Sequence, residues 1–185
     1  MYIKAEIEMH QETVELFKEQ CIPTLQKIAE ICRETLKNGH KIMLCGNGGS
    51  AADSQHIAAE FVGRFHKERI SLPAIALTTD TSILTAVGND YGYDVVFKRQ
   101  VEGLGREGDV LIGISTSGNS KNVIEAFMEA KAKGIKTIAF TGEKESRSSE
   151  VADITLRVPS TVTARIQECH ILSGHIICSF IDEEY

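Results

Sequence analysis

Two stretches of this chain, KIMLCGNGGSAADSQHIAAEF (residues 41–61) and DVLIGISTSGNSKNVIEAFMEAKAKG (residues 109–134), follow the same plan. Each begins with a short apolar run, turns through a loop of glycine, serine and asparagine, and continues with a helix-like stretch. This order is typical of a strand followed by a tight loop and a helix. Because repeated units of this kind build parallel sheets, the two stretches predict an α/β fold.

The rest of the chain continues the alternation. Predicted strands cover residues 41–45, 74–78, 109–114, 136–141 and 154–158, and predicted helices cover residues 51–65, 80–87, 93–104, 122–133 and 161–181. We therefore expect one domain over residues 1–185, with a five-stranded parallel sheet flanked by helices in a flavodoxin-like, three-layer sandwich.

The first 37 residues are a helical segment ahead of the first strand. Their apolar residues recur at spacings of three, four and seven, which predicts one apolar stripe. Pro23 lies inside this pattern and predicts a kink or a break just before it. Such a stripe needs something to pack on, so we expect residues 1–37 to form oligomerising helices and residues 38–185 to form the α/β core.

The composition excludes several classes of protein. The net charge of −6 argues against a nucleic-acid-binding surface, and no apolar run is long enough for a membrane span. The five cysteines form no close CxxC pair, which indicates free thiols in a reducing compartment. No basic stretch followed by an apolar one opens the chain. We expect a cytoplasmic protein that binds neither nucleic acid nor membranes.

The two loops predict a phosphate-binding site. In parallel sheets, ligands bind at the carboxyl ends of the strands, where both loops fall. Glycines allow close approach of a ligand, a helix N-terminus attracts anions, and hydroxyls donate hydrogen bonds. Many serine loops merely cap helices. The density of hydroxyls in the second loop favours binding of a phosphorylated small molecule, through Ser115, Thr116, Ser117 and Ser120.

His56 and Glu60 are candidates for chemistry because residues four apart share one face of a helix. They suit either proton transfer or half of a metal site. The plain alternative for Glu60 is a surface carboxylate on an amphipathic helix. His175 lies in an apolar run, where a core or interface histidine is the alternative.

The longer motifs are more specific. They are CGNGGSAAD (45–53), HIAAE (56–60), VGNDYG (87–92), GISTSGNS (113–120) and RIQECH (165–170), followed by His175. With these motifs the chain resembles the sugar isomerase (SIS) fold and, more narrowly, the phosphoheptose isomerase family, over nearly its whole length.

The resemblance implies an aldose–ketose isomerase that converts D-sedoheptulose 7-phosphate to D-glycero-D-manno-heptose 7-phosphate through an enediol. This reaction opens heptose nucleotide biosynthesis for bacterial lipopolysaccharide or capsule. The resemblance also implies a cytoplasmic homotetramer with active sites between subunits and one zinc ion per subunit, without a nucleotide cofactor.

By the same resemblance, Glu60 is the base and His175 the second proton-transfer group. The implied zinc ligands are His56, Glu60, Gln167 and His175. The implied substrate-binding residues are Asn47, Gly48, Gly49, Ser50, His56, Glu60, Asn89, Asp90, Ser115, Thr116, Ser117, Ser120 and Gln167.

Three conditions accompany these assignments. Gln167 and His175 are eight residues apart, about 12 Å along a helix, so we expect ligands from two subunits or a bent helix. A nitrogen that ligates zinc cannot act as an acid, so the two roles of His175 belong to different states of the enzyme. Ala164 replaces an aspartate that some members of the family carry.

Arg64 and Arg165 are possible charge partners in the site, and we expect His170 to be structural.

Two other functions remain open at this point. One is a non-catalytic SIS protein that binds a protein partner, as do relatives that associate with the bacterial replication initiator. A scaffold would not need the full set His56, Glu60, Gln167 and His175. The other is an isomerase of another phosphosugar such as arabinose 5-phosphate, although members of that family usually carry appended regulatory domains.

Overall fold

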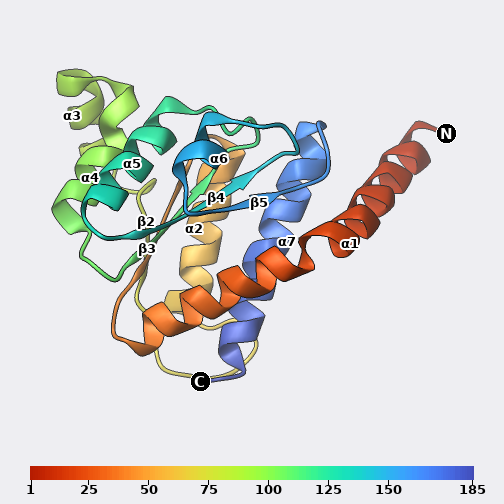
Figure 1. Ribbon diagram of the computed structural model, residues 1–185, viewed down its shortest axis with the longest axis horizontal. Helices are drawn as coiled ribbons and strands as arrows, with labels where there is room; N and C mark the ends of the chain where they lie inside the picture. Colours follow the sequence, from red (N-terminus) through yellow and green to blue (C-terminus); the bar gives the residue numbers. More distant parts are fainter.

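The computed structural model describes residues 1–185 and contains one five-stranded sheet. Its strands are β1 (Ile42–Gly46), β2 (Ala74–Ala76), β3 (Val110–Ile114), β4 (Lys136–Thr141) and β5 (Ile154–Arg157). They lie in the order β2-β1-β3-β4-β5, and every neighbouring pair is parallel (Figure 1). The predicted five-stranded parallel sheet is confirmed.

Helices cover both faces of the sheet. They are α1 (Tyr2–Lys37), α2 (Gly49–Val62), α3 (Thr81–Tyr91), α4 (Val96–Leu104), α5 (Lys121–Ala132), α6 (Arg147–Val151) and α7 (Thr163–Asp182), with a short 3-10 turn at Tyr93–Val95. Side chains of α1, α2 and α7 share one hydrophobic core, and those of α4 and α5 share the other. The molecule is therefore the expected three-layer sandwich.

The apolar strands are explained by their position between these two cores. Successive side chains of a strand point to opposite faces. Ile42 and Leu44 of β1 accordingly belong to the core under α1, α2 and α7, and Met43 and Cys45 belong to the other core. A strand buried on both faces has no need of polar residues, which is why it reads as a continuous apolar run.

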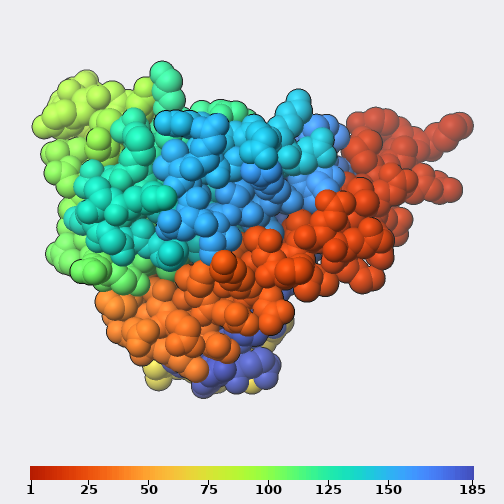
Figure 2. Space-filling view, viewed as in Figure 1, coloured from red at the N-terminus to blue at the C-terminus, as the bar shows by residue number.

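Helix α1 decides between the two alternatives predicted at Pro23, because it bends and does not break. It runs unbroken from Tyr2 to Lys37, and its axis changes direction part-way along (Figure 1). Proline removes only one backbone hydrogen bond, that to Glu19, and packing of Cys21 and Leu25 against the core holds the helix on both sides of it. The N-terminal part of α1 extends beyond the body of the molecule (Figure 2).

Smaller differences lie at element ends. Strand β2 ends at Ala76 and not at residue 78, and α3 continues to Tyr91. The short helix α6 was not predicted from the sequence. No helix combines the length and the apolar character that crossing a bilayer requires.

Candidate functional site

The topology creates a crevice between β1 and β3. From β1 the chain passes to β2 on one side and then returns to β3 on the other, so the order reverses between these two strands. In open parallel sheets, ligands bind at the carboxyl ends of the strands where the order reverses. Both glycine- and serine-rich loops follow the strands that flank this point, at residues 47–48 and 115–120.

The two loops are joined by a pair of amides. Asn47 donates from Nδ2 to Oδ1 of Asn122 at 2.9 Å, and Asn122 donates back at 2.8 Å. Asn122 is buried and lies in the first turn of α5. Sequence reasoning missed Asn122 because nothing local shows that its partner is in the other loop.

The second loop brings its hydroxyls together at the start of α5. Ser115 Oγ is 3.0 Å from Ser120 Oγ, and Ser117 Oγ accepts a hydrogen bond from the Asn119 amide at 3.2 Å. Ser120 is the N-cap residue, yet its side chain makes no capping bond. The first amides of α5 are thus not capped by this side chain, as an anion site at a helix N-terminus requires.

Gly118 allows the loop to turn. Its φ is +64°, a conformation that side chains rarely adopt, and a Cβ there would overlap the Ser146 side chain. Thr116 and Ser117 border a hollow of about 300 Å³ beside the loop, which also reaches Gly142 and Lys144.

The first loop lies against the start of α7. Gly48 has a φ of +55°, and Ser50 is buried. A Cβ on Gly49 would come within 2.9 Å of the Gln167 side-chain nitrogen, so the missing side chain gives Gln167 its place. Gln167 therefore belongs to the carboxyl edge of the sheet.

A second group of predicted residues meets between α2 and α7. The Nε2 atoms of His56 and His175 are 2.9 Å apart, and His56 Nε2 is 3.3 Å from Glu60 Oε1. The His56 side chain is 50% exposed and that of Glu60 is 21% exposed. The ring of Phe65 stacks on His175 with a centroid distance of 5.5 Å. The spacing of His56 and Glu60 thus leads to a real contact, and His175 joins it.

Gly174 makes this meeting possible. A Cβ at Gly174 would overlap the side chain of Ile57. Because α7 has no side chain at that point, the Ile57 side chain of α2 fits against Gly174, and the helices approach closely enough for the neighbouring His56 and His175 to touch.

Asp53 belongs to the same face of α2. Burial raises the pKa of its carboxyl, and the nearby His56 and His175 oppose that rise. The spacing of Asp53, His56 and Glu60 by three and four residues is the sequence signal that places Asp53 on this face.

Within one chain the predicted residues do not gather at a single point. Along α2, Gly49 and His56 are seven residues apart, about 10 Å. Gln167 and His175 are separated by about 12 Å along α7. Asn89 and Asp90 lie at the exposed end of α3, where Asn89 donates to Asp90 at 2.8 Å. The loops with Gln167, the His56–His175 group and the end of α3 are three separate clusters.

The chemistry of the metal-ligand candidates suits zinc, which binds imidazole and carboxylate. The two Nε2 atoms have the spacing of a hydrogen bond, whereas two nitrogens on one tetrahedral zinc are about 3.3 Å apart. No group of three or more His, Cys, Asp and Glu side chains is placed to hold a metal ion.

Three other residues have structural partners. Arg165 is buried and donates to Glu6 and Glu168, which fastens α1 to α7. Arg64 is exposed and lies 3.6 Å from Glu68. His170 is fully buried with Nε2 3.2 Å from the Thr141 carbonyl oxygen, in agreement with the structural role expected for it.

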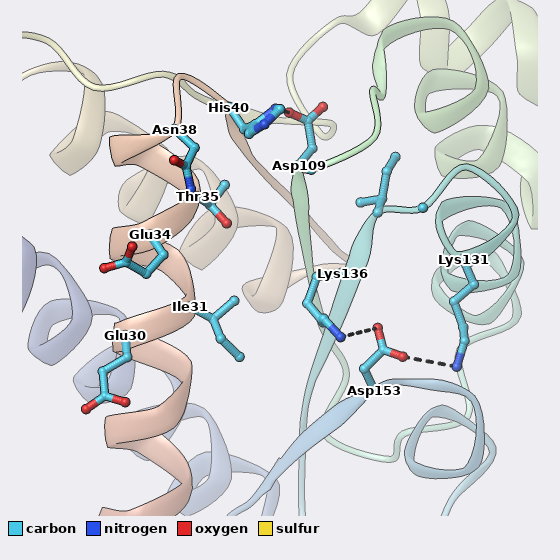
Figure 3. Close-up of a pocket in the computed structure, with 13 residues that line it drawn as sticks. Glu30, Ile31, Glu34, Thr35, Asn38, His40, Asp109, Lys131, Lys136 and Asp153 are labelled. Atoms are coloured by element: carbon cyan, nitrogen blue, oxygen red, sulfur yellow. Dashed lines mark ion pairs between the residues drawn. The ribbon is translucent and has the colours of Figure 1, made fainter.

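A larger hollow, of about 590 Å³, lies at the opposite edge of the sheet. Figure 3 shows it between the C-terminal part of α1 and the starts of β3 and β4. Its lysines Lys131 and Lys136 both pair with Asp153, at 3.3 and 3.8 Å. Since it lies at the amino ends of the strands, it is separate from the loops that flank the crevice.

Comparisons with known proteins agree with this geometry. Residues 7–142 match the SIS domain family. The chain is 59% identical to the phosphoheptose isomerase of Nitratiruptor sp. over 100% of this chain and 98% of the relative, and 61% identical to that of Aliarcobacter butzleri over 95% and 93%.

Solved structures give the same result. The phosphoheptose isomerase of Neisseria gonorrhoeae superimposes with a TM-score of 0.94 and 46% identity, over 98% of this chain and 97% of the other. That of Francisella tularensis gives a TM-score of 0.95 and 39% identity over the same shares. The chain belongs to the phosphoheptose isomerase family of SIS-domain enzymes.

Proposed function

We propose that this chain converts D-sedoheptulose 7-phosphate to D-glycero-D-manno-heptose 7-phosphate, with Glu60 and His175 as its proton-transfer groups. Membership in the family supports the reaction. The observation that carries the residue assignment is the contact among His56, Glu60 and His175 between α2 and α7. The product is the precursor of heptose nucleotides for lipopolysaccharide or capsule.

In this proposal the serine loop binds the phosphate. The hydroxyls of Ser115, Ser117 and Ser120 converge beside the first amides of α5, which carry the positive end of the helix dipole. A site of this kind holds a dianion without a charged side chain, which accords with the net negative charge of the chain. Thr116 completes the hydroxyl set.

The first loop binds the sugar end of the substrate. Asn47, Gly48, Gly49 and Ser50 line the edge of the crevice next to Gln167, with which they would hold hydroxyl groups or the oxygens of the enediol. Asn89 and Asp90 would add contacts to the sugar. Because they lie at the end of α3, apart from the other clusters, this contact would be made within the oligomer or after closure.

The proposed isomerisation has two half-reactions, formation of the enediol and its collapse to the aldose, and the protons balance in each. The Glu60 carboxylate takes a proton from C1, the C1–C2 double bond forms, and the C2 carbonyl oxygen receives a proton from His175. Glu60 then returns a proton to C2, while the C1 hydroxyl gives its proton to His175 and leaves an aldehyde at C1. His56 holds the Glu60 carboxylate at 3.3 Å in the orientation that the helix imposes.

Zinc is part of the proposal, with His56, Glu60, Gln167 and His175 as the residues that would hold it, one ion per subunit. His175 would hold the ion in a different state of the enzyme from the one in which it transfers protons. When bound, zinc supplies a Lewis acid for the carbonyl and hydroxyl oxygens of the substrate. The set needs Gln167 from a bent helix or a second subunit, because about 12 Å of helix separates it from His175.

We further propose a cytoplasmic homotetramer in which residues 1–37 pack between subunits and residues 38–185 form the core. Tyr2, Ile3 and Ile7 are exposed on the part of α1 that projects from the body, so this helix carries apolar surface that a second copy would cover (Figure 2). The five buried cysteines are all free, which suits a reducing compartment. Native mass spectrometry would test the assembly.

The test of the reaction is proton NMR of sedoheptulose 7-phosphate in D2O with the purified protein. We expect an aldose anomeric signal and deuterium at the carbon next to the carbonyl. Glu60→Gln should abolish both while leaving phosphosugar binding intact, and Glu68→Gln, an exposed carboxylate eight residues further on, should change neither. Binding without exchange in the wild type would instead favour the scaffold function, and no binding would favour another phosphosugar.

A further inference from the structure

Arg69 is a buried charge that the proposed function does not use. It lies in the segment between α2 and β2, and its side chain is 0% exposed. Its guanidinium donates to Oδ1 of Asp182 at 2.7 Å and to the backbone carbonyl oxygens of Glu60 and Phe61 at 2.8 and 2.9 Å. A charged side chain is almost never buried this completely unless it is paired.

The two carbonyls that Arg69 binds are at the C-terminus of α2. The last four carbonyls of a helix have no partner within the helix, and a cation there also complements the helix dipole. One of these carbonyls belongs to Glu60 itself, the proposed base. Arg69 therefore fixes the backbone that carries the Glu60 side chain.

The other end of the ion pair is on α7. Asp182 is 1% exposed, and its second oxygen accepts hydrogen bonds from the His66 and Lys67 amides at 2.7 and 3.0 Å. Burial alone would raise the pKa of this carboxyl, but Arg69 and the two amides hold it below its ordinary value. Asp182 lies seven residues after His175, two helical turns along the same face.

The segment held by the ion pair also reaches His175 directly. Phe65 precedes the two amides that Asp182 binds, and its ring stacks on the His175 imidazole with an interplanar angle of 20°. One buried ion pair thus connects the backbone of Glu60, the helix that carries His175 and the aromatic ring on that imidazole.

We propose that Arg69 and Asp182 are positioning residues that set the Glu60 carboxylate against the His175 imidazole. This inference rests on the proton-transfer roles proposed above. Stability alone does not explain the pair, since a buried ion pair is often replaced by apolar residues at no cost. An apolar pair cannot donate to the Glu60 and Phe61 carbonyls or accept from the His66 and Lys67 amides, and a misplacement of about 1 Å lowers a rate about a hundredfold.

The test compares three variants with a matched control. Arg69→Lys keeps the charge but cannot reach all the acceptors of a guanidinium, and Asp182→Asn removes the charge of its partner. The double variant Arg69→Met with Asp182→Leu replaces the pair by apolar side chains. Lys41→Met is the control, because Lys41 pairs with Asp109, another buried carboxylate that accepts two backbone amides, at the opposite edge of the sheet.

We expect each Arg69 and Asp182 variant to lower kcat by about tenfold to a hundredfold with KM within about twofold, at a temperature well below its Tm. The apolar double variant should regain much of the Tm lost by the single variants without regaining kcat. Lys41→Met should lower Tm and leave kcat unchanged.

The proposal is overturned if kcat recovers together with Tm in the double variant, or if Arg69→Lys lowers kcat no more than Lys41→Met does. If the double variant does not fold, the comparison of kcat between Arg69→Lys and Lys41→Met decides the question alone. Glu60→Gln is measured alongside. If it stays active, the proposed base is wrong and the positioning role falls with it. If it is inactive while the Arg69 variants keep full kcat, only the positioning role fails.

Discussion

Asn47 and Asn122 hydrogen-bond to each other through both ends of their side-chain amides, at 2.9 and 2.8 Å. The pair connects the loop after β1 with the first turn of α5, across the crevice where the strand order reverses. In the proposed function these two loops bind opposite ends of one substrate. Their separation is therefore fixed by a contact that is itself outside the phosphate cradle.

Asn122→Ala should raise KM several-fold and lower kcat less, because the loops lose their fixed separation while the proton-transfer groups stay in place. In a double-mutant cycle with Asn47→Ala, the coupling between the two substitutions in the free energy of unfolding should be about 1–2 kcal/mol, as expected for two hydrogen bonds. Urea unfolding and steady-state kinetics measure both. Asn38→Ala, at the end of α1, is the control. A coupling near zero would mean that the loops are held independently.

Ser117→Ala with Ser120→Ala should raise KM by at least tenfold and change kcat much less. Each hydroxyl would donate to a charged phosphate, and such bonds contribute about 1.5–3 kcal/mol. Uniform binding of this kind affects KM more than kcat. Ser179→Ala, a hydroxyl on α7 without a hydrogen bond, serves as the comparison. Unchanged KM in the double variant would remove the serine loop from phosphate binding.

Gly174→Ala should separate α2 from α7. The added Cβ overlaps Ile57, and overpacking of this kind costs about 1–3 kcal/mol. Because the His56–His175 contact depends on this approach, kcat should fall by about tenfold or more. Chemical denaturation and kinetics are the measurements. Gly103→Ala, whose Cβ would meet nothing within 4 Å, should leave kcat unchanged. Equal effects of the two substitutions would show that the approach of the helices is irrelevant to the rate.

Removal of zinc should lower the rate if the ion polarises the substrate oxygens. We expect a chelator-treated sample, verified as metal-free by elemental analysis, to lose most of its activity and to recover it on addition of zinc. His56→Ala should reduce the bound metal per subunit, and His40→Ala, at the opposite edge of the sheet, should not. Full activity of a metal-free sample would make the metal dispensable.

The sequence was sufficient to predict the sheet and the loops at its carboxyl edge. A strand buried on both faces is a continuous apolar run, and such a run is visible in the sequence alone. It was insufficient where long-range packing decides. Nothing local shows that α1 passes through Pro23, since the core contacts that hold it come from α7 and from strands far along the chain. Likewise, the spacing of His56 and Glu60 indicated a shared face, but His175 is 119 residues away from His56.

The same limit applies to charges. Arg165 and Arg69 are both arginines near proposed site residues, and the sequence offered only the first as a charge partner. The structure instead uses Arg165 to fasten α1 to α7, and it buries Arg69 between α2 and α7. Which arginine reaches which carbonyl depends on where α2 and α7 end relative to each other. No local sequence pattern predicts that relationship.

His170 makes stability depend on pH. Its Nε2 lies 3.2 Å from the Thr141 carbonyl, which accepts a hydrogen bond only if Nε2 carries the proton, and its Nδ1 is buried without a partner. Burial is the main cause that lowers the pKa of His170 from 6.5 to about 4, and the Thr141 carbonyl opposes it.

A histidine with a lowered pKa in the folded protein binds its proton more readily in the unfolded chain. Its contribution to stability is therefore fully present above pH 6.5 and is lost as the pH falls towards 4. Between pH 7 and pH 5 the free energy of unfolding should fall by about 2 kcal/mol from this residue. His170→Gln keeps a donor for Thr141 and does not titrate, so urea unfolding at the two pH values should show a smaller loss. An equal loss in the variant would show that another titrating group, and not His170, causes the pH dependence in this range.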